Sequence, residues 1–125
     1  MKNMKLDFDC IREILLAVES QTGYQEYTSA YAVVEAIDKF TSDVVMYHIN
    51  QCELYGFFTE VRHYQNGDDD STIIDLSPKG HEFIRNIRSE NTWNSIKKVI
   101  AKMGTVSVSM LAKIAEKYIM SILPF

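Results

Sequence analysis

The sequence predicts a mainly α fold with a small β-hairpin, which is an α+β class. Apolar residues recur at helical spacing at both ends of the chain, whereas residues 57–64 are rich in β-branched and aromatic residues and residues 72–76 form a second strand-like run. Gly56 stands between the two patterns, where a helix would end and a strand begin. A helix that leads through glycine into a two-stranded hairpin is typical of the winged helix. We therefore expect a winged helix-turn-helix core with additional C-terminal helices.

The first half of the chain predicts three helices. Asp7 can cap the first, whose inner face would be formed by Ile11, Ile14, Leu15 and Val18. Residues 24–29 are polar and turn-like. Residues 30–40 fit a helix by their apolar spacing but also fit a short strand, and we interpret them as helix. Thr41 or Ser42 can cap the third helix, with Val45, Ile49 and Cys52 turned inward.

The second half predicts the hairpin and then further helices. Residues 57–64 and 72–76 read as strands, joined by a loop at 65–71 that contains Asp68, Asp69 and Asp70. Ser77-Pro78 is a typical helix start, and a break near 89–91 precedes another helix that Gly104 would end. The inward residues of that helix would be Trp93, Ile96, Ile100 and Met103. Ser107 would cap a last helix, with an apolar stripe of Val108, Leu111, Ala115, Tyr118, Ile119 and Ile122.

Length and composition predict one globular domain over residues 1–125. Its core would span about residues 5–88, with a helical extension over about 89–123. Hydrophobic residues make up 46% of the chain, but no apolar run approaches the roughly 20 residues that span a bilayer, and residues 1–9 do not resemble a signal peptide. We expect a cytoplasmic location without a membrane partner. Cys10 and Cys52 should be reduced, buried thiols.

No motif in the sequence predicts catalysis. His81-Glu82 begins like the zinc-protease motif, but Arg85 stands where the second histidine is needed. The aspartates at 68–70 lack the glycine and glutamate of a calcium-binding loop. Phosphate-binding glycine loops and a nucleophile with a histidine at readable spacing are also missing from the sequence. We therefore expect no enzyme, no metal site, no cofactor and no small-molecule substrate.

The charges are divided unevenly along the chain. Residues 1–78 hold five basic and fourteen acidic residues, a balance of −9, and residues 79–125 hold eight basic and three acidic, a balance of +5. Such asymmetry indicates polarised surfaces. An acidic half beside a basic half also suits self-association.

Two groups of residues are candidates for binding. If residues 41–55 form a recognition helix, its outward surface comprises Ser42, Asp43, Met46, Tyr47 and Asn50. The candidate basic patch comprises Arg62, Lys97, Lys98, Lys102, Lys113 and Lys117. Tyr24, Tyr27 and Tyr31 lie in the weakly patterned region and could form an exposed cluster, and tyrosine is enriched at protein contacts.

Two stretches of sequence resemble known patterns. Tyr47-His48-Ile49-x-x-Cys52-x-x-x-Gly56-Phe57 is similar to the end of the recognition helix in many bacterial winged-helix regulators. Across nearly the whole chain, the segments at 4–15, 47–48 and 76–88, with Trp93, Ser107, Leu111 and Ala112, resemble a family of small proteins of unknown function from bacteria and their phages. The resemblance implies a winged-helix-like fold and an origin in a mobile element, and it transfers no functional residue.

Two functions remain after these observations. The first is a non-catalytic, regulatory binding protein that keeps the winged-helix frame and binds a protein partner or itself, since acidic surfaces repel DNA. The second is a DNA-binding transcriptional regulator that uses the basic C-terminal face. We prefer the first, because Lys and Arg are missing between Lys39 and Arg62, where a DNA-binding helix and hairpin would need them.

Overall fold

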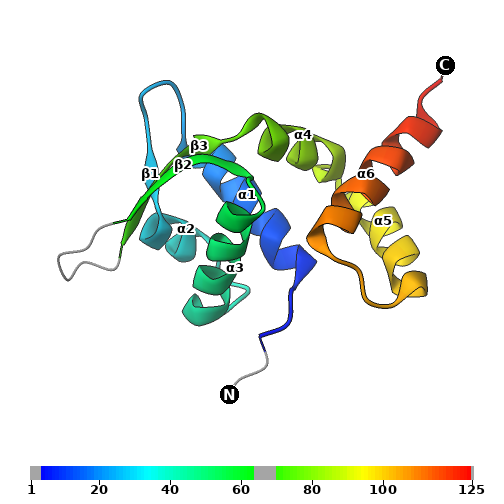
Figure 1. Cartoon of the computed structure of the whole chain (residues 1–125), viewed down its shortest axis with the longest axis horizontal. Coiled ribbons are helices and arrows are strands. Elements are labelled where there is room, and N and C mark those ends of the chain that lie inside the picture. Colours follow the sequence, from blue (N-terminus) through cyan, green and yellow to red (C-terminus); the bar gives the residue numbers. More distant parts are fainter. Residues whose placement is uncertain (1–3, 64–69, 125) are drawn as a thin grey trace. The chain divides into compact units, whose positions relative to one another are not determined.

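The computed structural model describes residues 4–63 and 70–124. Within them lie six helices and one small antiparallel sheet, which confirms the α+β prediction (Figure 1). The elements are α1 (Phe8–Gln21), β1 (Thr28–Ser29), α2 (Ala30–Ala36), α3 (Ser42–Leu54), β2 (Phe58–His63), β3 (Ser71–Leu76), α4 (Pro78–Ile87), α5 (Glu90–Met103) and α6 (Val108–Ile122). The chain divides into two compact units, Met1–His81 and Glu82–Phe125.

Helix α1 begins where the sequence predicts. The Asp7 carboxylate accepts hydrogen bonds from the backbone N–H groups of Asp9 and Cys10, at 3.0 and 3.3 Å. These bonds satisfy two of the donors that a helix start leaves without intrahelical partners. The four predicted inward residues are all buried, as is Cys10.

The region after α1 differs from the prediction. Thr28 and Ser29 form a strand, β1, where we expected a turn, and they pair with Ile73 and Thr72 of β3. A two-residue strand is too short to show alternation, so only its partner reveals it. Helix α2 ends at Ala36 instead of Phe40. Ile37 lies within the predicted helix, but its backbone is extended. Its side chain is buried all the same, so its apolar character does not require a helix.

Helix α3 begins at its predicted cap, with the Thr41 hydroxyl 3.4 Å from the Val44 amide. Gly56 has φ +79°, a left-handed conformation that glycine adopts without steric cost, and it turns the chain from α3 into β2. Strand β3 lies between β1 and β2, so the sheet order is β1-β3-β2. The predicted acidic loop at 65–71 lies mostly outside the described residues, including Asp68 and Asp69.

A buried junction joins α3, the sheet and α4. The Ser77 hydroxyl accepts from the Gly80 amide at 3.0 Å and donates to the Gly56 carbonyl at 2.6 Å, so Ser77 caps α4 as predicted. Gly80 lies against the backbone of Phe57, and a Cβ at position 80 would fall 2.2 Å from the Phe57 carbonyl oxygen. Only glycine permits this approach between the helix and the start of the hairpin.

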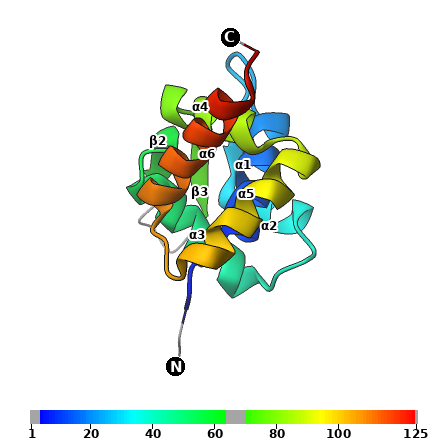
Figure 2. The ribbon, with the colours of Figure 1, turned by 90° about the vertical axis from the view of Figure 1, so that its right-hand side faces the viewer.

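The second unit contains the helical hairpin formed by α5 and α6 (Figure 2). Ser89 and Ser107 cap these helices, with their hydroxyls 3.3 and 3.1 Å from the amides of Thr92 and Met110. The apolar stripes face each other only in part. The buried members are Trp93, Ile96, Ile100, Val108, Leu111 and Ala115.

Two residues predicted to point inward are exposed instead. Met103 is 49% exposed and Ile122 is 56% exposed. Both lie on the inner side of their helix by spacing, but they occupy the last turn of α5 and of α6. No described segment packs over these two last turns. Apolar spacing alone therefore assigns more residues to the core than are buried there.

Candidate functional site

The outward surface of α3 is the first candidate site. Ser42, Asp43 and Asn50 are exposed, and Met46 and Tyr47 are half-buried. Asp43 is the one charged side chain of the five. The Tyr47 ring packs edge-on against His48, with ring centroids 5.4 Å apart. The surface offers an aromatic ring, a thioether and short polar groups but no cation.

The buried His48 side chain fixes α3 to the start of α1. Its Nδ1–H donates to the Val44 carbonyl at 2.8 Å, and its Nε2 accepts from the Asp7 backbone N–H, also at 2.8 Å. This pair of bonds requires the neutral ring with its proton on Nδ1. No sequence pattern predicts this role, because Asp7 lies 41 residues from His48 in the chain.

A hydroxyl, an imidazole and a carboxylate line up at the end of the β2–β3 hairpin where its connecting loop begins. His63 Nε2 lies 3.0 Å from both carboxylate oxygens of Glu53, and its Nδ1 lies 2.9 Å from the Ser71 hydroxyl. The order of groups is that of a serine nucleophile activated by histidine. However, the His63 side chain is 57% exposed, so water screens the carboxylate and competes for the hydroxyl. We interpret the network as a brace that ties the hairpin to the last turn of α3.

Arg62 is engaged within the hairpin region. Its Nε donates to the Glu60 carboxylate at 2.9 Å, and its guanidinium lies 5.9 Å from the centroid of the Tyr27 ring. The carboxylate offsets the charge that this residue would bring to a candidate basic patch.

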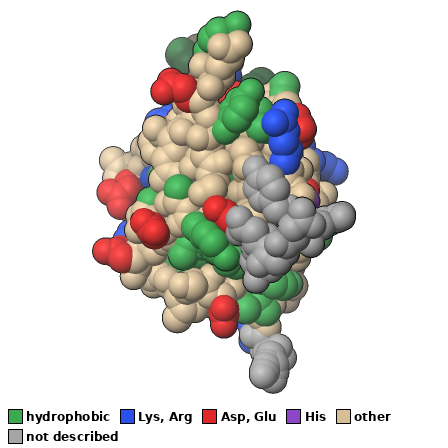
Figure 3. All heavy atoms as spheres, turned by 90° about the vertical axis from the view of Figure 1, so that its left-hand side faces the viewer, with side chains coloured by type: hydrophobic (Ala, Val, Ile, Leu, Met, Phe, Trp, Pro, Cys, Tyr) green, Lys and Arg blue, Asp and Glu red, His purple; other side chains and the backbone are tan. Residues whose placement is uncertain are grey.

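Three exposed tyrosines form a second candidate site, beside β1. Tyr24, Tyr27 and Tyr31 are 90%, 49% and 46% exposed. Tyr31 is tied to the hairpin, since its backbone N–H donates to the Asp70 carboxylate at 3.1 Å. We call the three tyrosines, together with Glu26, Glu60 and Asp70, the tyrosine surface. Figure 3 shows hydrophobic side chains on this side of the first unit, with acidic and some basic side chains beside them. By contrast, the aromatic side chains of Phe57, Phe58 and Trp93 are buried.

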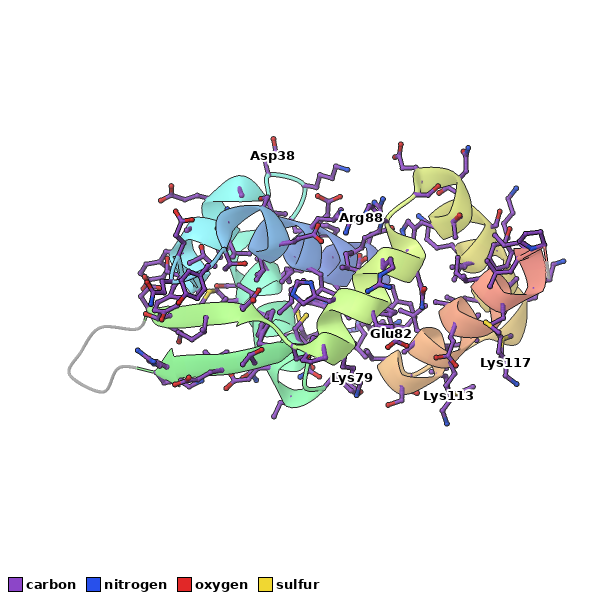
Figure 4. All side chains as sticks on the ribbon, turned by 90° about the horizontal axis from the view of Figure 1, so that it is seen from above. Asp38, Lys79, Glu82, Arg88, Lys113 and Lys117 are labelled. Carbon is purple, nitrogen blue, oxygen red and sulfur yellow. The ribbon has the colours of Figure 1, made fainter. Side chains whose placement is uncertain are left out.

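The predicted basic patch is distributed over both units. Arg62 belongs to the first unit, whereas the five lysines belong to the second. The Lys97 ammonium lies 5.7 Å from the Trp93 ring centroid, and its side chain is half-buried. The other four are exposed, and Lys113 and Lys117 project from the same side of α6 (Figure 4).

The two cysteines are free and buried, as expected. Burial raises the pKa of the Cys10 thiol from 9.0 to about 12, with smaller contributions from the charges of Asp7 and Glu13. Burial also raises the pKa of Cys52. A thiol that stays protonated is a poor nucleophile, so neither cysteine is a reactive site.

The described residues form neither a metal-ligating cluster nor a membrane-spanning helix. They contain no group of three or more metal-ligating side chains close enough to hold an ion. Among their helices, none combines the length and apolar character needed to cross a membrane.

Sequence comparison places the chain in a family. A family model described as "Hypothetical protein (DUF2513)" matches residues 5–107, and the chain belongs to this family. It is also similar to an uncharacterized protein of Haemophilus influenzae, with 30% identity over 122 residues that cover 96% of this chain and 99% of the relative. No solved structure matches the chain. The resemblance to a family of unknown function is thus confirmed, while winged-helix character and phage origin stay predictions.

Proposed function

We propose that the chain is a winged-helix protein with a non-catalytic, regulatory binding role, and that its partner is a protein rather than DNA. The order of elements supports the winged helix. Three helices precede a hairpin, and a short strand between the first two helices pairs with β3 in the sheet order β1-β3-β2. In a winged helix, α3 would be the recognition helix and β2–β3 the wing.

The observation that carries the proposal is the charge of α3 and its hairpin. Helix α3 contains no Lys or Arg from Ser42 to Leu54, but it contains Asp43 and Glu53. Arg62 on β2 is bonded to Glu60. Lysine and arginine that neutralise phosphates supply essentially all non-specific affinity for DNA. The surface that a winged helix would present to the groove is therefore poorly suited to a polyanion.

This surface is better suited to a protein. Tyr47 and the tyrosine surface supply large, amphipathic contact area, and the acidic groups favour a basic partner. A cytoplasmic, regulatory protein derived from a mobile element fits these properties and the family resemblance.

A second function is favoured by one observation. Lys98, Lys102, Lys113 and Lys117 are exposed on two neighbouring helices of the second unit. A DNA-binding regulator could use this basic C-terminal face in place of α3.

Fluorescence anisotropy with labelled duplex DNA tests the two functions against each other. The duplexes are a random sequence and the region upstream of the gene, each at low and moderate salt. We expect no binding at either salt concentration. Micromolar or tighter binding that weakens steeply with salt would overturn the protein-binding function. In that case, loss of binding in Lys98→Glu/Lys102→Glu but not in Asn50→Ala would place the DNA on the C-terminal face.

A further inference from the structure

The side of α6 that points away from its buried stripe carries an ordered set of exposed residues. Met110, Lys113, Lys117 and Met120 follow one another at steps of three, four and three, so they share one side of the helix. Met110 and Met120 are 43% and 61% exposed, and the lysines between them are exposed as well (Figure 4). We call these four residues the α6 outer face.

The chemistry of this face defines what would bind it. Methionine is flexible and polarisable and packs against aromatic rings, and it is frequent on protein-binding surfaces. Lysine covers apolar surface with its stem while its ammonium seeks a carboxylate. The complementary surface therefore combines aromatic rings with acidic groups.

The first unit presents such a surface. The unit 1–81 holds six basic and fourteen acidic residues, a balance of −8, and the unit 82–125 holds seven and three, a balance of +4; these add to the −4 of the chain. The tyrosine surface combines three exposed rings with carboxylates. Within the first unit, the Arg62 guanidinium shows how a cation can be held by a ring and a carboxylate, because it lies over Tyr27 and is bonded to Glu60.

Charge also decides between two modes of self-association. A symmetric contact between two α6 outer faces would set lysines against lysines, and like charges in contact cost affinity. A contact between the α6 outer face and the tyrosine surface sets lysines against carboxylates and methionines against tyrosines.

We propose that the α6 outer face of one copy binds the tyrosine surface of a second copy, in a head-to-tail contact. The inference rests on the proposed protein-binding function and names its partner as the chain itself. Because the two surfaces differ, the contact is heterologous and can extend to a ring or a chain of copies.

Sedimentation velocity of the full chain, across its soluble concentration range, tests the contact. At about 0.01 M ionic strength, where the Debye length is about 30 Å, we expect dimers or larger species, and fewer of them at about 0.15 M, where it is about 8 Å. A chain that stays monomeric at low ionic strength would overturn the proposal.

Charge reversal locates the contact. Lys113→Glu/Lys117→Glu should weaken self-association by about tenfold or more, since two ion pairs become repulsive. Lys98→Glu/Lys102→Glu is the matched control on α5, because it changes the net charge equally at the same four-residue spacing. An equal effect of both variants would overturn the assignment to α6. Circular dichroism verifies that each variant folds.

A rescue experiment tests the pairing of the two surfaces. Glu26→Lys/Glu60→Lys should also weaken self-association, and mixing it with Lys113→Glu/Lys117→Glu should restore dimers. Failure of the mixture to associate, while the wild type does, would overturn the pairing. If the chain is monomeric and does not bind DNA, only the self-association proposal is overturned. If it binds DNA in the anisotropy experiment, the protein-binding function itself is overturned.

Discussion

The imidazole of His48 accepts a hydrogen bond from the backbone N–H of Asp7, which lies 41 residues earlier, across 2.8 Å. Asp7 also caps α1 with its side chain. The same residue therefore holds the start of α1 with its carboxylate and contacts α3 with its backbone amide. His48 is completely buried, and its other ring nitrogen is bonded within α3. The bond therefore fixes how the first and third helices meet.

Replacing His48 with leucine should lower the free energy of unfolding by about 1–3 kcal/mol, because the Asp7 amide would lose its acceptor in a partly buried place. Urea denaturation measures the change. His63→Leu is the matched control, since the His63 side chain is 57% exposed and its loss should change stability by less than about 1 kcal/mol. If both variants lose the same free energy of unfolding, the bond between His48 and Asp7 makes no specific contribution to stability.

Gly80→Ala should destabilise the first unit although alanine favours helices by about 1 kcal/mol over glycine. The new Cβ would meet the Phe57 carbonyl oxygen at 2.2 Å, and overpacking of this kind costs about 1–3 kcal/mol. The same urea experiment gives the sign. In Gly23→Ala, the control, the added Cβ meets the Glu26 carboxylate at 3.0 Å, and that flexible side chain can move away. A stabilised Gly80→Ala protein would contradict the close approach.

The two thiols should resist a thiol reagent such as Ellman's reagent at neutral pH in the folded protein and react when it is unfolded. The raised pKa of Cys10 also predicts how the stability of the fold changes with pH. The folded pKa of Cys10 is about 12 and its ordinary value is 9.0, so the unfolded chain releases this proton first as pH rises. The contribution to stability is complete below pH 9 and is lost between about pH 9 and 12.

Urea denaturation across that pH range checks this expectation. The wild type should lose stability more steeply than Cys10→Ala/Cys52→Ala, which keeps the lysines and tyrosines that titrate in the same range. Parallel curves would exclude a thiol contribution.

Lys97→Ala should destabilise the second unit by about 0.5–1 kcal/mol, since the ammonium lies over the Trp93 ring. Trp93 is the one tryptophan of the chain, so its fluorescence during urea denaturation reports on this unit. Lys98→Ala, which removes a neighbouring exposed lysine, should have no comparable effect. If Lys98→Ala lowers stability by as much, the effect comes from the loss of a positive charge and not from the contact with Trp93.

Local chemistry made much of the fold predictable. The caps Asp7, Ser77 and Ser107 were predicted correctly because each bonds an amide two or three residues away. The end of α3 at Gly56 was predicted correctly because helices often end in a left-handed residue, a conformation that glycine adopts without steric cost. An exposed cluster of Tyr24, Tyr27 and Tyr31 was one alternative that the weak pattern of their region left open, and all three side chains are exposed.

Features that depend on distant partners were missed. Strand β1 exists because β3 pairs with it, and the line of Glu53, His63 and Ser71 forms because α3 ends beside the hairpin. Met103 lies on the apolar side of α5 by spacing but finds no cover among the described residues. None of these features can be predicted from the few residues that surround it in the sequence.

The sequence by itself determined where helices begin, which helix faces are apolar, and that the two halves carry opposite charge, because these follow from residue types at short spacing. Only the tertiary structure decided that His48 is a buried acceptor for Asp7, that Gly80 must be glycine, and that Arg62 lies over Tyr27. Each of these is a contact between segments far apart in the chain, and its geometry is set when the backbone brings them together.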